Sequence, residues 1–545
     1  MKLIDQRIKK IMERCKENAT KAGLSFQNET LEYIVTNRDL LDLSPKNMIP
    51  TLYDYWVHDI KILQERKIYE LYPNNPYETV INTRPAISFY NDNNPDWLNV
   101  MIFYHVLAHI DFFQNNSLYK HTWNDDFAGA ALADKRLIAD LRSENGRWVD
   151  YIIEFTRGID NLTGFYDELA EINFPKEIKA SKKIDFYFDV FLNKILKTST
   201  SKYYKEIDRY NECKKKFPDM FETIFFSEIE KKHPEFESFF IREKNNNKDK
   251  QSAGSDIIKY INDNSKFLNE RKNRWMKSVV EIVRKTAINF EPQIRTKILN
   301  EGWASYWHEK LFLQDDSITG HEVDFARINA RVMSMPKAGL NPYAIGWRLL
   351  MHIEELANKG KLSYNYQKIN DINLREKYNQ KTNSGLKYIF DIRDNYSDFM
   401  FINSFVDQEF VDKYKLYVVG RRLNPGKGVF EYYVKSKNAE DYKKMLIDSL
   451  YHPPHITVEE SKIKNNELYL NHHFEGKPLV QEYIHNTMIG IEYLYGSSVH
   501  FETSEIVKKH DDAAWNRTQF DNRSEPEYKR VLYTIKNKGL SKKFL

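Results

Sequence analysis

Two pairs of side chains in this sequence have the types and the spacing needed to hold a metal ion. His105 and His109 are four residues apart, and Glu301 and His308 are seven residues apart. Residues at these spacings share one face of an α-helix, because a turn takes 3.6 residues. Two imidazoles at i and i+4 can bind one ion together. We therefore expect the helix that carries the histidine pair, over 97–116, to meet the helix that carries Glu301 and to hold a divalent metal with it.

Each of these residues also has a plainer interpretation. The histidines lie among apolar residues such as Phe103 and Phe112, so they could be hydrogen-bonded core residues. A buried imidazole needs a partner, because an unsatisfied polar group costs about 1–3 kcal/mol. Glu301 could cap a helix or form a salt bridge within a bundle. Gly302 costs helix stability, yet it allows another backbone or a ligand to approach closely beside the carboxylate.

Composition excludes several classes of protein. The chain has 545 residues, 41% of them hydrophobic, which predicts a globular protein with packed cores. Lys and Arg number 82 against 78 Asp and Glu, so the charge balance predicts no nucleic-acid partner. No run approaches the roughly 18 apolar residues of a membrane span, and the N-terminal residues lack the apolar segment of a signal peptide. With two isolated cysteines, these features indicate a cytoplasmic protein.

The pattern of secondary structure predicts an α+β protein with two domains. Residues 1–400 are mainly helical, with helices over 1–35 and 51–72 and two paired strands near 79–81 and 87–89. A polar stretch at about 243–254 is an expected exposed linker loop within this domain. After residue 400 strands alternate with helices in an order close to β-α-β-β-α-β. We therefore predict a small ferredoxin-like α/β domain over 401–545.

Several segments together resemble the stage V sporulation protein R (SpoVR) family. The resemblance is carried by 105–109 (His-Val-Leu-Ala-His), 300–308 (Asn-Glu-Gly-Trp-Ala-Ser-Tyr-Trp-His), 339–343 (Gly-Leu-Asn-Pro-Tyr), 468–476 and 495–503. It implies a cytoplasmic bacterial protein linked to formation of the spore cortex, a peptidoglycan layer. It does not supply a biochemical activity. Unknown protein partners could bind through the C-terminal domain.

A second resemblance bears on the site. The Asn-Glu-Gly-Trp-Ala segment is similar to the Asn-Glu-Gly-Phe-Ala segment of gluzincin aminopeptidases, whose Glu binds zinc. Their HExxH helix is similar to 105–109. Carried over by position, this implies that His105, His109 and Glu301 are the ligands of a gluzincin-like site, with zinc as the expected metal. His308 falls where those enzymes often carry a second Glu.

The mechanism stays open, because Val106 stands where the HExxH glutamate would be and valine cannot accept a proton. One hypothesis is a metal-dependent hydrolase of peptide or amide bonds in which another residue serves as the base; the candidates are Asp111, His308 and Glu309. Asp111 is two residues from His109 and so points away from its face, which favours a supporting role. The other hypothesis is a non-enzymatic binding or regulatory protein, in which His308 completes a closed set of four ligands.

Overall fold

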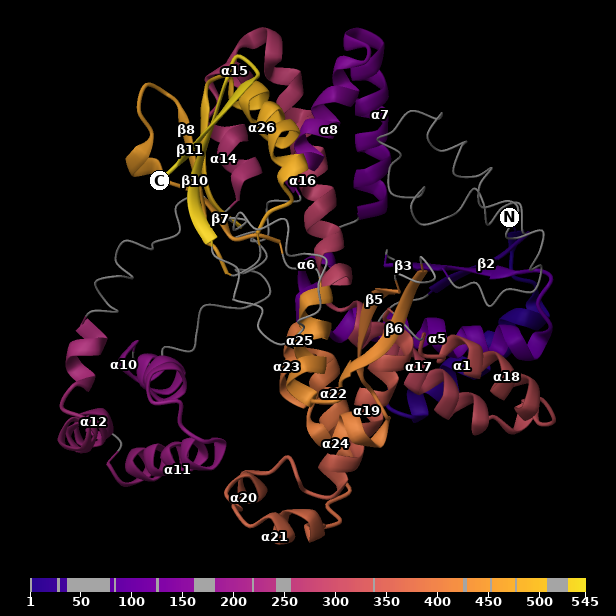
Figure 1. Cartoon of the computed structure of the whole chain (residues 1–545). Helices are drawn as coiled ribbons and strands as arrows, with labels where there is room; N and C mark the ends of the chain where they lie inside the picture. The colour runs from indigo at the N-terminus through magenta and orange to yellow at the C-terminus, as the bar shows by residue number, and fades with distance from the viewer. Residues whose placement is uncertain are drawn as a thin grey trace.

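The computed structural model describes residues 2–26, 30–36, 79–82, 85–123, 127–160, 182–217, 220–241, 256–336, 339–424, 429–450, 453–475, 478–506 and 528–545. The predicted helix over 51–72 and the predicted linker over 243–254 lie outside these ranges. The described residues are mostly helical with smaller sheets, which confirms the α+β class (Figure 1). In this part of the chain no helix is both long enough and apolar enough to cross a bilayer.

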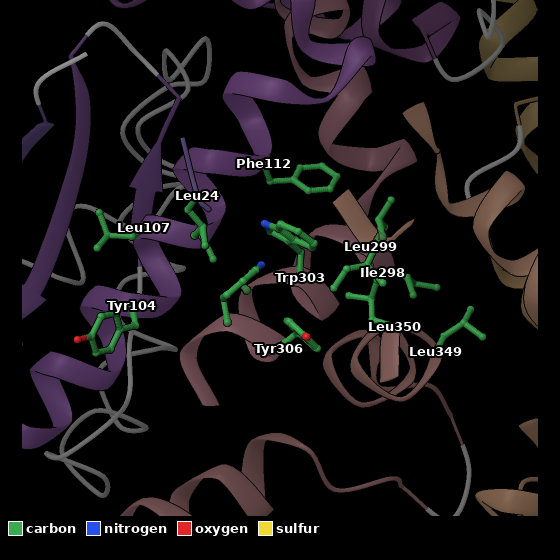
Figure 2. Packing of buried hydrophobic residues seen from close by; sticks show 14 of the residues in the cluster. Leu24, Tyr104, Leu107, Phe112, Ile298, Leu299, Trp303, Tyr306, Leu349 and Leu350 are labelled. Atoms are coloured by element: carbon green, nitrogen blue, oxygen red, sulfur yellow. The ribbon is translucent and has the colours of Figure 1, made fainter. Parts of the chain in front are cut away.

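The first hydrophobic core is built around helix α5 (Asp96–Asn115), which is buried on nearly every side. A helix that is apolar all round must lie inside a protein, and α5 packs against both α17 (Lys297–Leu313) and α1 (Gln6–Lys21). Figure 2 shows Trp303 of α17 at the centre of this core, close to Phe112 of α5. The predicted helix over 97–116 is thus confirmed to within a residue. The other helices around this core are α6 (Lys120–Trp123), α18 (Glu322–Val332), α19 (Pro342–Asn358), α22 (Gly385–Asn395), α23 (Asp398–Phe405), α24 (Gln408–Lys413) and α25 (Ala439–Ser449). Two short helices, α20 (Tyr364–Gln367) and α21 (Ile372–Lys377), follow α19 and contribute no residue to this core.

A four-stranded sheet in the order β1-β2-β4-β3 adjoins this core. Its strands are β1 (Lys2–Leu3), β2 (Thr30–Val35), β3 (Thr79–Ile81) and β4 (Ala86–Asn91). β3 and β4 are antiparallel, which confirms the predicted strand pair. The predicted helix over 1–35 is wrong beyond Lys21. Gly23 has φ +107°, a conformation that ends the helix, and Thr30–Val35 then pairs in parallel with β4.

A second core joins three distant parts of the chain. Isoleucines and valines of the helices over 127–160 and 256–295 pack together against the C-terminal sheet. The helices are α7 (Phe127–Asn145), α8 (Trp148–Asp160), α14 (Ile257–Asn264), α15 (Lys266–Asn269), α16 (Arg274–Arg295) and α26 (Gln481–Tyr495). The first core, in contrast, includes residues of the C-terminal part of the chain as far as Leu446. The division into 1–400 and 401–545 stays a prediction, and the hydrophobic cores group the residues differently.

The predicted ferredoxin-like arrangement of the C-terminal part is wrong. The sheet has five strands in the order β11-β10-β9-β8-β7, and the β5–β6 hairpin forms a separate sheet. Helix α25 packs into the first core through Tyr442 and Leu446, which leaves α26, among the described helices, as the crossover between the parallel strands β8 and β9. Most β6 side chains are exposed, so neither face of the hairpin is packed against the five-stranded sheet. The strands are β5 (Val418–Asn424), β6 (Val429–Ser436), β7 (Ile456–Val458), β8 (Leu468–His472), β9 (Val499–Ile506), β10 (Tyr528–Lys536) and β11 (Gly539–Phe544).

A third cluster, rich in phenylalanine and tyrosine, holds the helices over 182–241 together. Figure 1 shows these helices beside the rest of the molecule. They are α10 (Lys182–Asp185), a π-helix at Phe186–Ile195, α11 (Thr200–Lys216) and α12 (Phe221–Lys232).

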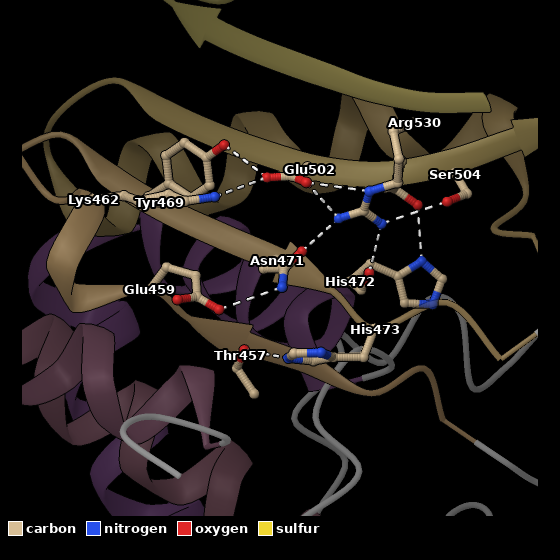
Figure 3. Close-up of polar contacts among 11 residues, drawn as sticks. Thr457, Glu459, Lys462, Tyr469, Asn471, His472, His473, Glu502, Ser504 and Arg530 are labelled. Carbon is tan, nitrogen blue, oxygen red and sulfur yellow. Dashed lines mark hydrogen bonds and ion pairs between the residues drawn. The ribbon is translucent and has the colours of Figure 1, made fainter. Parts of the chain in front are cut away.

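One face of the C-terminal sheet carries a polar network centred on Arg530 (Figure 3). The guanidinium donates to Glu502 at 2.6 Å, to Asn471 at 2.7 Å and to the His472 carbonyl at 2.9 Å. The His472 ring is buried, and its Nδ1 lies 2.8 Å from Thr503 Oγ1. Burial, followed by the charge of Arg530, lowers the pKa of His472 to about 4.

This buried imidazole predicts that acid destabilises the fold. The native state holds His472 neutral, whereas the unfolded chain protonates it near pH 6.5, so its contribution is present above that pH and is lost as pH falls towards 4. Between pH 7 and pH 4, we expect the free energy of unfolding of the wild type to fall by about 2 kcal/mol more than that of His472→Asn. Urea unfolding at several pH values measures this, with the exposed His485→Asn on α26 as the control. A difference that does not change with pH would contradict the prediction.

Candidate metal site

The site lies where α5 and α17 cross. Contacts on two sides of α17 hold this helix in position. Asp398, at the start of α23, accepts hydrogen bonds from the Ile298 and Leu299 N–H groups at 2.8 Å each and so caps α17. Burial raises the pKa of Asp398 to about 7 against the lowering effect of these two donors. On another side of α17, Gly302 faces Gly346 of α19 so closely that an added Cβ would lie 2.5 Å from the Gly346 Cα. The close backbone approach expected beside Glu301 is therefore the approach of α19.

His105, His109 and Glu301 come together at this crossing. The Glu301 Oε2 atom is 3.5 Å from His109 Nε2 and 4.0 Å from His105 Nε2. One ligand atom from each residue lies within 4.8 Å of the other two. Two ligands of a tetrahedral zinc ion, each bound at about 2.1 Å, are about 3.4 Å apart. The three side chains are thus close to the spacing that one zinc ion requires.

The neighbours of the two imidazoles determine which ring nitrogen carries the proton. His109 Nδ1 is 2.9 Å from Asn300 Oδ1, an oxygen that can only accept, so Nδ1 is the donor. His308 Nε2 is 3.0 Å from Asn329 Oδ1 and donates to it for the same reason. A neutral His308 then accepts at Nδ1, and His105 Nδ1, 2.7 Å away, donates to it. Both His105 and His109 therefore present the lone pair of Nε2 towards Glu301.

Three electron-pair donors thus point into one small volume. Two imidazole lone pairs and a carboxylate oxygen repel one another unless a proton or a metal cation lies between them. Hydrogen bonds to the other ring nitrogen are the usual way in which proteins orient metal-binding histidines. His105 and His109 are 2% and 5% exposed, whereas the Glu301 side chain is 17% exposed. The Glu301 Oε2 and His105 Nε2 atoms that face one another are nevertheless both buried, so the exposed part of Glu301 lies elsewhere on its side chain.

The structure places His308 behind His105. Its two nitrogens lie against His105 and Asn329, and the three-residue group does not include it. Glu309, the next residue, accepts from Asn329 Nδ2 at 3.3 Å, and burial raises its pKa. His308 and Glu309 are therefore linked through one asparagine, on the far side of His105 from Glu301.

Asp111 lies on a different face of α5. One carboxylate oxygen accepts from Arg393 Nη1 at 2.6 Å and from the Ser25 N–H at 2.7 Å, and the other accepts from Trp303 Nε1 at 2.9 Å. The residue is fully buried, and burial raises the pKa of Asp111 against the opposing charge of Arg393. Asp111 joins α5 to α17 and α22 and is directed away from His105, His109 and Glu301.

Three residues at the site had no role assigned from the sequence. Asn300 directly precedes Glu301, and its position in the 300–308 segment is a signal that could have identified it. Asn329 lies on α18, 21 residues from His308, and no local pattern connects the two. Tyr343, at the start of α19, stacks on the His105 ring with centroids 6.0 Å apart. Only the tertiary fold brings Asn329 and Tyr343 to the histidines.

Comparison with known proteins shows the family to which this chain belongs. The model of a family described as SpoVR like protein matches residues 4–452, a range that contains every residue of the group and its neighbours. The chain belongs to the SpoVR family. This confirms the resemblance found in the sequence and makes the chain a member of a sporulation-associated family.

A curated relative of this SpoVR-family chain is the uncharacterized protein YcgB of Escherichia coli (strain K12). It is 21% identical over 341 residues, which are 59% of this chain and 59% of YcgB. The match thus spans about three-fifths of the length of that relative. No solved structure matches the chain.

Proposed function

We propose that this SpoVR-family protein binds one divalent metal ion, zinc, through His105, His109 and Glu301. The observation that carries the proposal is the convergence of three ligand atoms within 4.8 Å of one another on two crossing helices. The hydrogen bonds from Asn300 and His308 support it, because they leave Nε2 of each ligand histidine ready to bind a cation. We place this function in the cytoplasm during formation of the spore cortex.

We further propose that the metal serves hydrolysis of peptide or amide bonds in cortex peptidoglycan or its precursors. Three protein ligands with a position left for substrate are typical of catalytic zinc sites, and His105, His109 and Glu301 supply three. Such a metal, when bound, polarises a carbonyl group and activates water. His105 and His109 orient it, and His308, with Glu309 beyond Asn329, would hold a proton behind His105.

One observation favours a second candidate function. Val106, at the position of the gluzincin base, is fully buried among apolar residues of the first core. The residue that follows the first ligand in the sequence therefore cannot accept a proton. A metal that stabilises a binding or regulatory protein of cortex assembly would need no proton acceptor.

Metal analysis of the purified protein tests the site. We expect about one zinc ion per chain in the wild type and less than a tenth of that in His105→Ala and Glu301→Gln. His485→Ala, which changes an exposed histidine on α26, should keep the full content. Chelation should lower the melting temperature of wild type by about 5 °C or more, because a ligand that binds only the native state stabilises it. A wild type that takes up no stoichiometric metal, with Glu301→Gln merely less stable, would exclude the metal site.

Turnover then separates the two candidate functions. Metal-loaded wild type is incubated with cell-wall peptides and muropeptides, and the products are resolved by mass spectrometry. Cleavage that is absent in Glu301→Gln supports the hydrolase. Stoichiometric metal without cleavage supports the binding protein.

A further inference from the structure

A cavity of about 460 Å³ opens on another side of α19, and none of the proposed metal ligands lines it. Its walls come from α19, from the segment between α24 and β5, from the β5–β6 hairpin and from α25 (Figure 1). Pockets of this size hold a small organic molecule. The polar and aromatic side chains of the wall include Arg348, Tyr414, Lys415, Arg421, Tyr432 and Tyr442.

The charge of this wall is entirely positive. Arg348, Lys415 and Arg421 line the cavity, and no aspartate or glutamate is among the lining residues. Within the described ranges, no ion pair joins any of these three cations to a carboxylate. Three positive charges in one concave wall attract an anion, and the low-dielectric surroundings strengthen that attraction.

Of the three cations, Arg348 is the most buried, so its charge is the least solvated by water. It is half-buried on α19, and among the described residues its guanidinium contacts the Ala344 carbonyl, at 3.5 Å, and the face of Tyr414, at 5.9 Å. Burial lowers the pKa of Arg348, and the groups that oppose this effect are the phenols of Tyr414 and Tyr442. An arginine that has no carboxylate among the described residues can bind an oxyanion through two parallel N–H groups.

Tyr442 supplies an independent sign of a missing ligand. The residue is 2% exposed and lines the cavity, and its hydroxyl has no hydrogen-bond partner within the described part of the chain. Burial raises the pKa of Tyr442 to about 12, so the phenol keeps its proton and can donate it in a hydrogen bond. Buried hydroxyl groups in proteins almost always have a partner. A ligand atom that accepts from Tyr442 would provide one once a small shift of the wall uncovers the hydroxyl, which is buried in this structure.

We propose that this cavity binds an organic phosphate of mononucleotide size. The phosphate would lie against Arg348 and accept from Tyr442, with Lys415 and Arg421 completing its neutralisation. Three cations match the double charge of a phosphate monoester better than the single charge of a carboxylate. The planar part of the ligand would pack against the exposed ring of Tyr432, because aromatic faces stack well on planar rings.

Binding measurements with the full chain test this site. Isothermal titration with AMP, GMP, CMP and UMP is compared with titration of inorganic phosphate, adenosine and benzoate. We expect at least one nucleotide to bind and the other three probes to bind at least tenfold more weakly. Absence of binding by all four nucleotides would overturn the proposal, and so would benzoate binding as tightly as the best nucleotide.

Variants identify the cavity as the place of binding. Arg348→Gln and Tyr442→Phe should each weaken the nucleotide at least tenfold; Tyr442→Phe removes only the hydroxyl and so keeps the packing. Arg327→Gln, on the exposed face of α18, should have no effect. Glu301→Gln should bind the nucleotide as the wild type does, which separates this site from the metal site. Unchanged affinity in correctly folded Arg348→Gln and Tyr442→Phe would refute the assignment.

Discussion

Gly346→Ala is expected to lower the free energy of unfolding by about 3 kcal/mol or more, and to weaken metal binding with it. The added methyl group would clash with the Ile298 carbonyl oxygen and lie 2.7 Å from the Gly302 Cα. Both are backbone atoms, so no side chain can rotate to make room. Helix α19 would have to move away from α17 at the residues that flank Glu301.

Gly158→Ala on α8 is the matched control. It makes the same change within a helix, but no atom lies within 4 Å of the added methyl group. Alanine in a helix is more favourable than glycine by about 0.8–1 kcal/mol, so this variant should be slightly more stable than the wild type. Urea unfolding and zinc content measure both effects. A Gly346→Ala protein as stable as wild type would show that α17 and α19 do not pack at this distance.

The sequence revealed the parts of the site that depend on local spacing. Helical periodicity placed His105 and His109 on one face, and the glycine beside Glu301 predicted a close approach by another element. The structure confirms both features, because each is set by a single helix and its immediate neighbour. The roles of His308 and Asp111 in catalysis stay predictions.

Long-range pairing is what the sequence could not predict. The exposed β6 strand has the residue types of any strand, so its local sequence does not show that β5–β6 forms its own sheet. The local sequence of α25 likewise does not show that this helix packs into the first core. Similarly, the apolar faces of α8 and α16 predict that these helices are buried. They do not indicate that the C-terminal sheet is the surface that buries them. Contacts of this kind depend on which surfaces fit together in three dimensions. The same limit applies to Asn329, which reaches His308 from a separate helix.

Three contacts in the structure hold α17 in place against its neighbours. Asp398 caps the first turn of α17, Gly346 sets its distance from α19, and Trp303 fixes it to α5 through Asp111. None of these contacts involves the proposed metal. The three ligands would therefore be close to their binding positions before a metal arrives, which reduces the entropy lost on binding.

Asp111→Asn is expected to lower the free energy of unfolding by about 3–5 kcal/mol, because it removes the fully buried partner of Arg393 and leaves this buried charge only the partly exposed Asp394. Trp303 would also donate to a neutral oxygen instead of a carboxylate. Asp394→Asn is the matched control, since Asp394 pairs with the same arginine at 2.7 Å but is 41% exposed. An exposed pair contributes at most about 1 kcal/mol, so this variant should remain close to wild type.

The same variant decides between the two roles of Asp111. If the carboxylate is structural, Asp111→Asn that is kept folded at low temperature should still bind one zinc ion, and Arg393→Met added to it should recover part of the lost stability. That recovery is expected because the second change removes the unpaired buried charge. If Asp111 is instead the proton acceptor of a hydrolase, Asp111→Asn should abolish cleavage with stability changed by less than about 0.5 kcal/mol. Its contacts with Arg393, Ser25 and Trp303 occupy both carboxylate oxygens and favour the structural role.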